Sequence, residues 1–300
     1  MFDNIAILTA APTFNIQLIF DGIFIGAIFA LAAYGLALVW GVMNVKNLCQ
    51  GEFVIMGGYL AYVLTQSGIH PIVSIVPVII VMFIFGWVTY YLVIRWIITH
   101  DLFTSLLATF GIALVIQQAL NLYFGPEIRT IDSGLEIRSL FDNMVTVAEV
   151  KLVSFVLCCI LATIVIVFMK RSRMGQAIRA TAQDARAARV MGIDTERVYA
   201  FTYALNAAIC GAAGVLVSLI WVLQPFYGIV HSIRSFVIVT AAGFGNLPGV
   251  IMSAFGLGLA EQYSGFVLGA EFQQATVVGL LVLVLVWRQI QMGRLRQVVK

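Results

Sequence analysis

Four polar side chains stand in stretches that are otherwise strongly apolar: Asn47, Gln50 and Glu52 close together, and Asn206 far along the chain. Apolar surroundings penalise a carboxylate unless it has a partner or a task, whereas amides there usually hydrogen-bond between helices. The four residues are therefore candidates for lining a path taken by a polar solute. Two other interpretations of Glu52 stay open: hydration at an interface, or a place in a first helical turn, where the helix dipole stabilises an acid.

Catalytic and metal chemistry find little support. The three histidines, His70, His100 and His231, lie far apart, and neither an HExxH nor a GxSxG pattern occurs. The four cysteines lack CxxC spacing, which predicts packing rather than metal binding. The run GFGNLPG at 243–249 lacks the Gly-Lys-Ser/Thr ending of a phosphate loop. We therefore expect no catalytic residue, no metal site and no cofactor bound by this chain.

The composition places these residues in a membrane protein. Of the 300 residues, 62% are hydrophobic and 10% charged, with a mean hydropathy of +1.03, whereas soluble domains carry about 25% charged residues. The predicted fold is all-α: a polytopic membrane helical bundle of eight or nine hydrophobic segments, forming one transmembrane domain over 1–300. The expected spans are 17–40, 52–67, 72–97, 102–123, 152–169, 197–222, 249–267 and 271–288, with a short ninth piece at 235–243.

The distribution of basic residues predicts the orientation. If 170–197 is cytosolic and the spans alternate, thirteen of the 17 Lys and Arg residues fall inside and four outside, as the positive-inside rule favours. This places the N-terminus outside and the C-terminus in the cytosol, which requires an odd number of crossings and hence a crossing at 235–243. Because the basic residues cluster beside the spans, where they contact lipid headgroups or partners, the net charge of +3 does not indicate nucleic-acid binding.

The stretch 170–197 carries seven of the basic residues and is rich in alanine. We expect a slim helix over 176–192 that ends at Gly192, with Asp194 or Thr195 capping the next helix. A helix of this kind between membrane spans can contact a soluble partner. The alternative is a basic anchor for lipid headgroups, although the stretch also carries acids and lacks bulky aromatic residues between 174 and 198.

Three patches carry a resemblance to a known family. GQAIRATAQDARAARVMGIDTERV at 175–198 resembles the cytosolic coupling loop of branched-chain amino acid permeases of the LivH type, a family of ABC importers. Residues 22–62 and GFGNLPGVIMSAFGLGLAEQ at 243–262 resemble two further parts of the same family. The chain departs from the family pattern at Gln50, where the family usually has His, at Ala242, and in the tail 287–294.

The resemblance implies partners and roles. ABC ATPase subunits would dock on the coupling loop and bind the ATP and Mg²⁺, a second LivM-like permease or a second copy would complete the pathway, and a periplasmic solute-binding protein would deliver the solute. The implied location is the bacterial inner membrane, among its lipids. By match to the family motif, the residues expected to couple to the ATPase are Gly175, Arg179, Asp184, Ala185, Ala188 and Gly192.

Alternatives remain open for the identity of the transported solute and for the source of energy. The resemblance favours a branched-chain or other apolar amino acid, and the departures leave urea, short amides or aromatic acids open. A rival class is a secondary transporter or channel, which would need an ion-coupling site built from buried charge pairs or broken helices. The loop 124–151 is either a solvated connection or a docking surface for a partner outside the membrane.

Overall fold

The computed structural model describes residues 12–98, 102–132, 134, 137–140, 145–243 and 246–298. Within these residues, ten α-helices are longer than ten residues, and shorter helices and turns join them. In chain order the elements are α2 (Pro12–Met43), α3 (Gln50–Gln66), α4 (Ile75–Thr89), a π-helical turn (Tyr90–Ile94), α5 (Arg95–Ile97), α6 (Leu102–Phe124), β1 (Ile137–Leu140), β2 (Val145–Ala148), α7 (Glu149–Arg171), α8 (Arg173–Gln183), α9 (Ala185–Val190), α10 (Thr195–Ile220), α11 (Gly228–Ala242), α12 (Leu247–Val267) and α13 (Gln273–Val298), with 3-10 turns at Pro225–Tyr227 and Ala270–Phe272.

The expected helical membrane bundle is confirmed. Seven helical stretches among the described residues are long and apolar enough to cross a membrane. Within the loop 124–151, strands β1 and β2 form a short antiparallel hairpin. Backbone hydrogen bonds between Arg129 and Leu223, of 2.9 and 2.8 Å, tie the same loop to the chain after α10.

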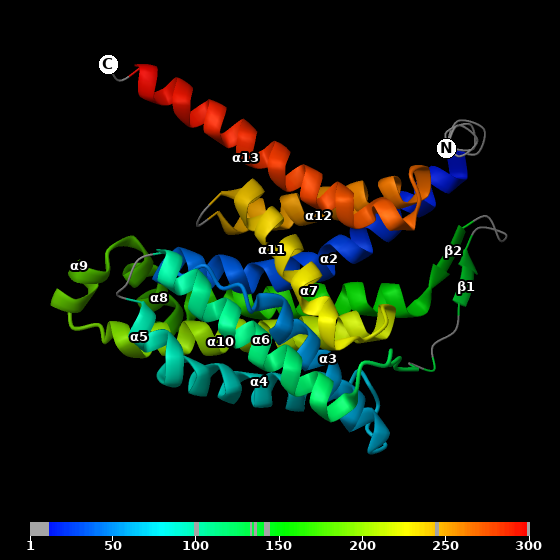
Figure 1. The fold of residues 1–300 in the computed structure, drawn as a ribbon, viewed down its shortest axis with the longest axis horizontal. Helices are drawn as coiled ribbons and strands as arrows, with labels where there is room; N and C mark the ends of the chain where they lie inside the picture. Colours follow the sequence, from blue (N-terminus) through cyan, green and yellow to red (C-terminus); the bar gives the residue numbers. More distant parts are fainter. Residues whose placement is uncertain are drawn as a thin grey trace.

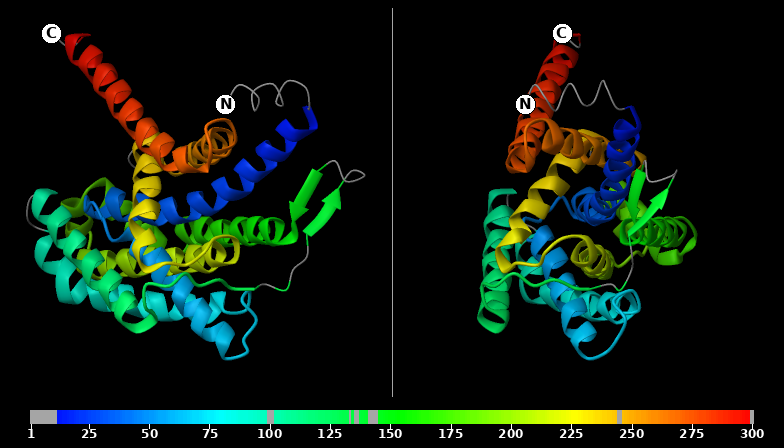
Figure 2. Two further views of the ribbon diagram at one scale, coloured as in Figure 1. Left: turned by 45° about the vertical axis from the view of Figure 1, so that its right-hand side comes forward. Right: turned by 90° about the vertical axis from the view of Figure 1, so that its right-hand side faces the viewer.

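The helices are not all parallel. α2, α4, α7 and α10 run roughly along the long axis of the molecule, whereas α3 and α11 cross them steeply (Figures 1 and 2). α12 and α13 lie to one side of this layer, and α13 projects away from the body toward the C-terminus. α2 and α10 form the buried centre of the bundle. In the most apolar 18-residue stretch of each helix, 94% and 83% of the residues are buried.

Close glycine packing holds the centre together. α3 meets α10 where a side chain on Gly57 would collide with the backbone of Gly211, and one on Gly214 with the carbonyl oxygen of Val54. α2 meets α12 in the same manner at Gly22 and Gly26. Small residues with three residues between them, such as Gly22 and Gly26, allow membrane helices to approach this closely and gain dispersion energy.

The ninth apolar piece is longer than the hydropathy of 235–243 suggests. α11 begins at Gly228, and the stretch Pro225–Ala242 is itself long and apolar enough to span. Its first half carries polar residues that lower the hydropathy, but they have partners in the fold. Arg234 makes two bonds to the Glu261 carboxylate, at 2.7 and 3.2 Å, and its guanidinium lies 4.8 Å from the ring centroid of Phe29.

Breaking the Arg234–Glu261 ion pair is expected to destabilise the protein strongly. Arg234→Met leaves a buried carboxylate without its cation, a change that costs about 3–5 kcal/mol. The double variant Arg234→Met/Glu261→Leu removes both charges, and we expect it to regain most of that loss. Thermal unfolding in detergent measures both, and a double variant no more stable than the single one would contradict this account of the pair.

Candidate functional site

The chain between α2 and α3 enters the bundle without helical structure. Asn44 begins this segment with a φ of 54°, a left-handed conformation that asparagine tolerates better than most residues. The segment is fastened to α6, because the Thr109 hydroxyl accepts a bond from the Leu48 amide and donates to the Lys46 carbonyl, both at 3.1 Å. α3 therefore starts inside the bundle. It covers the span expected at 52–67, and the non-helical segment before it is also part of the bundle.

Three of the four polar candidates form one buried cluster. Gln50, Asn47 and Asn206 are all 0% exposed. The Gln50 amide donates to the Ala32 carbonyl at 2.7 Å and to the Cys210 sulfur at 2.9 Å. Since Ala32 and Cys210 lie in the middle thirds of α2 and α10, the cluster lies beside the central parts of these two helices.

The cluster continues through neighbouring side chains. The Cys49 thiol donates to the side-chain Oδ1 of Asn47 at 2.8 Å, and the Cys210 thiol donates to the Oδ1 of Asn206 at 3.6 Å. Gly35 makes room, because a side chain there would collide with the Asn206 amide. The Asn47 and Gln50 amides thus bind one another and the backbone, whereas the Asn206 amide nitrogen has no hydrogen-bond partner among the described residues. The described cavities are lined by other residues. The proposed role of these amides in the path stays a prediction.

Glu52 is the member of the set that faces a cavity. It lies in the first turn of α3 and is 3% exposed. Gly228, the first residue of α11, packs directly against its carboxyl group, and a side chain at Gly228 would collide with it. Glu52 thus lies in a first helical turn, as one interpretation expected, and its deep burial does not agree with hydration at an interface. Its role stays a prediction.

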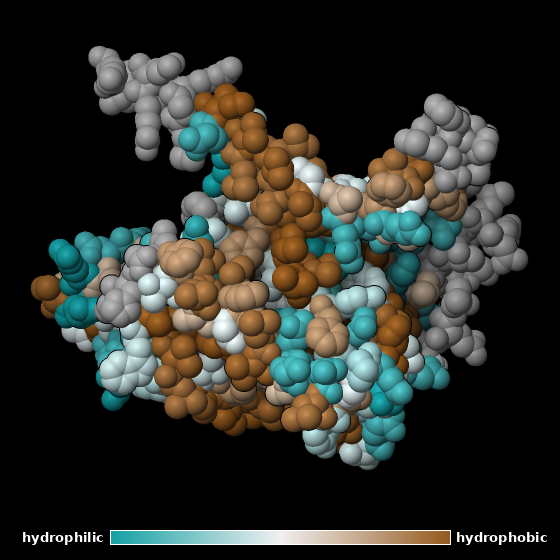
Figure 3. Space-filling view, in the orientation of Figure 1, coloured by the Kyte–Doolittle hydropathy of each residue, from teal (hydrophilic) through white to brown (hydrophobic). Residues whose placement is uncertain are grey.

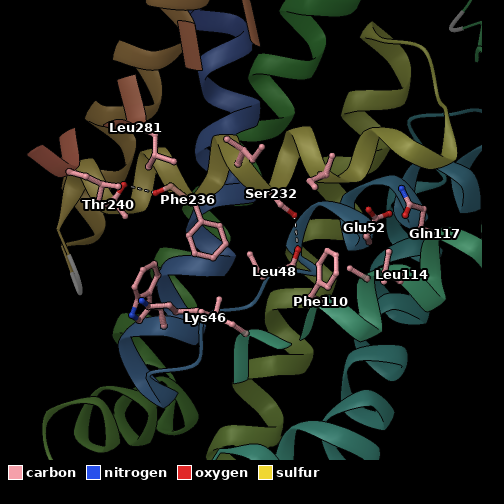
Figure 4. A pocket seen from close by; sticks show the side chains of 16 residues that line it. Lys46, Leu48, Glu52, Phe110, Leu114, Gln117, Ser232, Phe236, Thr240 and Leu281 are labelled. Atoms are coloured by element: carbon pink, nitrogen blue, oxygen red, sulfur yellow. Dashed lines mark hydrogen bonds between the residues drawn. The ribbon is translucent and has the colours of Figure 1, made fainter. Parts of the chain in front are cut away.

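The cavity beside Glu52 has a volume of about 640 Å³ and is mostly apolar. Figure 4 shows Glu52 and Gln117 toward one end and Lys46 toward the other, with Phe110 and Leu48 between them. The Lys46 ammonium lies 5.3 Å from the ring centroid of Trp40. The full lining is Trp40, Lys46, Leu48, Glu52, Leu106, Phe110, Ala113, Leu114, Gln117, Ile229, Ser232, Ile233, Phe236, Thr240, Leu281 and Leu285.

Sequence reasoning identified Glu52 in this lining but missed most of the rest. The walls come from α2, α6, α11, α13 and the segment before α3, which are far apart in the chain. Ser232 shows how they are joined: its hydroxyl accepts from the Gly51 amide and donates to the Leu48 carbonyl, both at 2.8 Å. The available signals were Gln117, a polar residue within an apolar span, and the serine Ser232 in the apolar run 225–242.

The coupling segment is two helices rather than the single helix expected over 176–192. α8 ends at Gln183 and α9 begins at Ala185, because Asp184 adopts an extended conformation with φ −154° and ψ 107°. Its carboxylate caps α9 by accepting from the amides of Arg186 and Ala187 at 2.8 and 3.0 Å. The cap satisfies amides that an unbroken helix would have bonded to carbonyls one turn earlier.

The same two amides lower the pKa of the Asp184 carboxyl, the Ala187 amide having the larger effect. A lowered pKa in the folded state means that the capping contribution is complete at neutral pH and is lost only as pH falls through the lowered value.

The helix end expected at Gly192 and the helix cap expected at Asp194 are confirmed. Gly192 follows α9 with φ +86°, and Asp194 caps α10 by accepting from the Arg197 amide at 3.2 Å.

The coupling candidates divide into buried supports and exposed groups. Gly175 is buried against the backbone of Met169, and Ala188 is 4% exposed, so both hold the segment against the bundle. Arg179, Asp184 and Gly192 are exposed, and Ala185 is half-buried. Sequence reasoning missed Val190 and Met191, which are 87% and 82% exposed at the end of α9. In Figure 3 the surface over α8 and α9 is largely hydrophilic, with a hydrophobic spot at its outer end.

No group of three or more His, Cys, Asp or Glu side chains that could hold a metal occurs within the described part of the chain. His100 lies outside the described residues. The four cysteines are free, with Cys49, Cys158 and Cys210 buried and Cys159 exposed.

Residues 18–286 match the family model described as the branched-chain amino acid transport system permease component. The chain belongs to this family. It is 27% identical to the high-affinity branched-chain amino acid permease LivH of Salmonella typhimurium, over 90% of this chain and 92% of the relative. It is 26% identical to BraD of Pseudomonas aeruginosa, over 91% and 94% of the two chains.

A further relative and a solved structure are also similar to this chain. The chain is 26% identical to a probable branched-chain amino acid permease, LivH, of Methanocaldococcus jannaschii, over 81% of this chain and 78% of that one. Among solved structures, PsaBC from Streptococcus pneumoniae in complex with Fab covers 95% of both chains at 11% identity and a TM-score of 0.49. As a member of the LivH-type permease family, the chain is a multi-pass membrane protein and a permease subunit of an ABC importer.

Proposed function

We propose that this chain carries a branched-chain or other apolar amino acid across the inner membrane of a bacterium. The match of the permease family over 18–286, with relatives named for branched-chain amino acids, is the observation that carries the proposal. The mostly apolar cavity of about 640 Å³ supports it, because sites for small organic ligands typically measure roughly 300–1,000 Å³ and carry a few polar groups.

The energy would come from partner ATPase subunits, which would bind the ATP and Mg²⁺. The short helix α9 lies at one end of the body, and Val190 and Met191 at its end are largely exposed, where a partner could contact them. Its base is anchored to the bundle: Arg189 donates to the Thr195 hydroxyl at 2.8 Å, and Arg95 pairs with Glu196 at 2.7 Å. A displacement of α9 by the ATPase would therefore be transmitted to α10 and, through the Arg95–Glu196 pair, to α5.

Two further partners complete the importer. A second permease, LivM-like or a second copy of this chain, would cover α13, whose apolar residues Leu283 and Trp287 are 65% and 55% exposed. A periplasmic solute-binding protein would dock at the opposite end from α9, where Lys151 pairs with Asp21 at 2.8 Å beside β2 and α7. In this proposed arrangement the N-terminus would lie outside and the C-terminus in the cytosol, as the charge distribution favours.

Affinity purification of the tagged chain from its native membrane, followed by mass spectrometry, tests the partner assignment. We expect an ATPase and a second permease to accompany the chain, or the ATPase alone if the permease is a homodimer. The chain alone after gentle solubilisation would contradict the proposal and favour a self-contained secondary transporter or channel.

A further inference from the structure

We propose that the Glu52 carboxylate binds the cationic amine of the transported solute inside the cavity, and so restricts the cargo to solutes that carry an ammonium group. The inference rests on the proposed function and sharpens it. It assigns the recognition of charge to one residue and excludes neutral solutes such as urea and short amides, and also acids without an amine.

The first argument is the missing partner of Glu52. Its side chain is 3% exposed, and its Oε2 atom has no hydrogen-bond partner among the described residues. The other deeply buried carboxylate of the bundle, Glu261, receives two bonds from Arg234. Because a buried charge in a membrane protein is normally paired, the partner of Glu52 is expected from outside the chain.

The second argument is the electrostatic setting. Glu52 lies in the first turn of α3, and its carboxyl group rests on Gly228, where α11 begins. The amino ends of two helices therefore converge on this carboxylate. Helix amino termini carry partial positive charge, which favours the ionised form of an acid. These helix ends oppose the cost of burying a charged carboxylate, and a bound ammonium group would oppose it further.

The third argument is the rest of the cavity. Glu52 opens into the same space as Phe110, Leu114 and Ile233, which offer apolar surface for a side chain. Lys46 stands toward the opposite end (Figure 4), so the cavity presents one charge of each sign. A solute with an ammonium group and an apolar side chain is complementary to the Glu52 end of this lining.

The test uses the whole importer with its ATPases, second permease and loaded solute-binding protein, reconstituted in proteoliposomes. For Glu52→Gln we expect the number of leucine molecules imported per ATP hydrolysed to fall at least tenfold, since losing one member of a buried charge pair weakens binding by roughly 30-fold or more. ATP hydrolysis stimulated by the loaded binding protein should stay within about twofold of the wild type. The binding protein itself is unchanged, so its own affinity cannot account for a difference.

Two comparison variants separate charge from structure. Glu271→Gln makes the same acid-to-amide change at an exposed position outside the cavity lining and should leave the leucine-to-ATP ratio unaltered. Glu52→Asp keeps the charge and should retain more import than Glu52→Gln. Wild-type import of leucine together with equal import by Glu52→Gln overturns the assignment of Glu52. A wild-type complex that imports no amino acid instead contradicts the proposed function.

A measurement on the wild-type complex covers the case in which Glu52→Gln fails to assemble. A hydrophobic carbodiimide reacts with carboxyl groups in apolar sites, and mass spectrometry of the peptide containing Glu52 reports the modification. We expect leucine and leucinol, which carry the ammonium group, to protect Glu52. 4-Methylpentanoate, which has the same carbon skeleton without the amine, should not protect it. Equal protection by all three, or by none, overturns the proposal.

Discussion

Replacing the two exposed apolar residues of α9 by acids, Val190→Asp with Met191→Asp, should abolish ATP-driven uptake while leaving the permease folded. Both side chains are more than four-fifths exposed, so the substitution removes no packing within the chain. If they insert into the ATPase, each lost contact costs about 2 kcal/mol or more, which corresponds to a fall in affinity of roughly 30-fold per residue. We therefore expect uptake to drop at least about 100-fold.

The measurement is the amount of ATPase that co-purifies with the double variant, together with uptake in proteoliposomes. The conservative double variant Val190→Ile/Met191→Leu serves as the matched control, because it keeps both side chains apolar, and it should couple normally. Normal uptake and normal ATPase association in the acidic variant would show that the end of α9 is not the docking site.

Adding a side chain at the contact between α3 and α10 should strongly lower the stability of the fold. A Cβ atom at Gly214 would overlap the Val54 carbonyl oxygen and lie 2.8 Å from the Gly58 nitrogen, and both of these atoms belong to the backbone. Backbone cannot rotate out of the way as a side chain can, so the helices must separate. We expect Gly214→Ala to cost about 3 kcal/mol, the upper part of the range for overpacked cores.

Gly256 on α12 is the matched comparison, because nothing lies within 4 Å of a Cβ atom built there. Gly256→Ala should be neutral or stabilise by about 1 kcal/mol, the usual gain in helix propensity. Thermal unfolding in detergent, followed by size-exclusion profiles, compares the two variants. Similar unfolding midpoints for Gly214→Ala and wild type would mean that the α3–α10 contact is looser than the structure indicates.

The sequence predicted the membrane bundle and several helix ends well, because these depend on local chemistry. Long apolar runs specify spans, and Gly192 and Asp194 end and begin helices by backbone conformation and side-chain capping. The break at Asp184 was missed because the alanine-rich run around it has high helix propensity throughout. Only the pairing of its carboxylate with two amides further on distinguishes the cap from a solvent-facing acid.

The candidate site was harder to predict than the fold. Glu52 could be singled out because an acid in an apolar stretch is costly, but its neighbours Phe110, Ile233 and Leu285 look like ordinary lipid-facing residues in the sequence. The start of α11 was hidden because Ser232 and Arg234 lower the local hydropathy, and their partners, Leu48 and Glu261, are remote in the chain. Such pairings become visible only once the helices are placed in space.

Uptake by the reconstituted importer, with and without ATP, tests the central claim most directly. The purified permease, its co-purifying subunits and the loaded solute-binding protein would be placed in proteoliposomes with equal ion concentrations on both sides. The account predicts leucine uptake that requires ATP on the α9 side and is unaffected by ionophores. Uptake that proceeds without ATP, follows an imposed ion gradient and needs only this chain would contradict it.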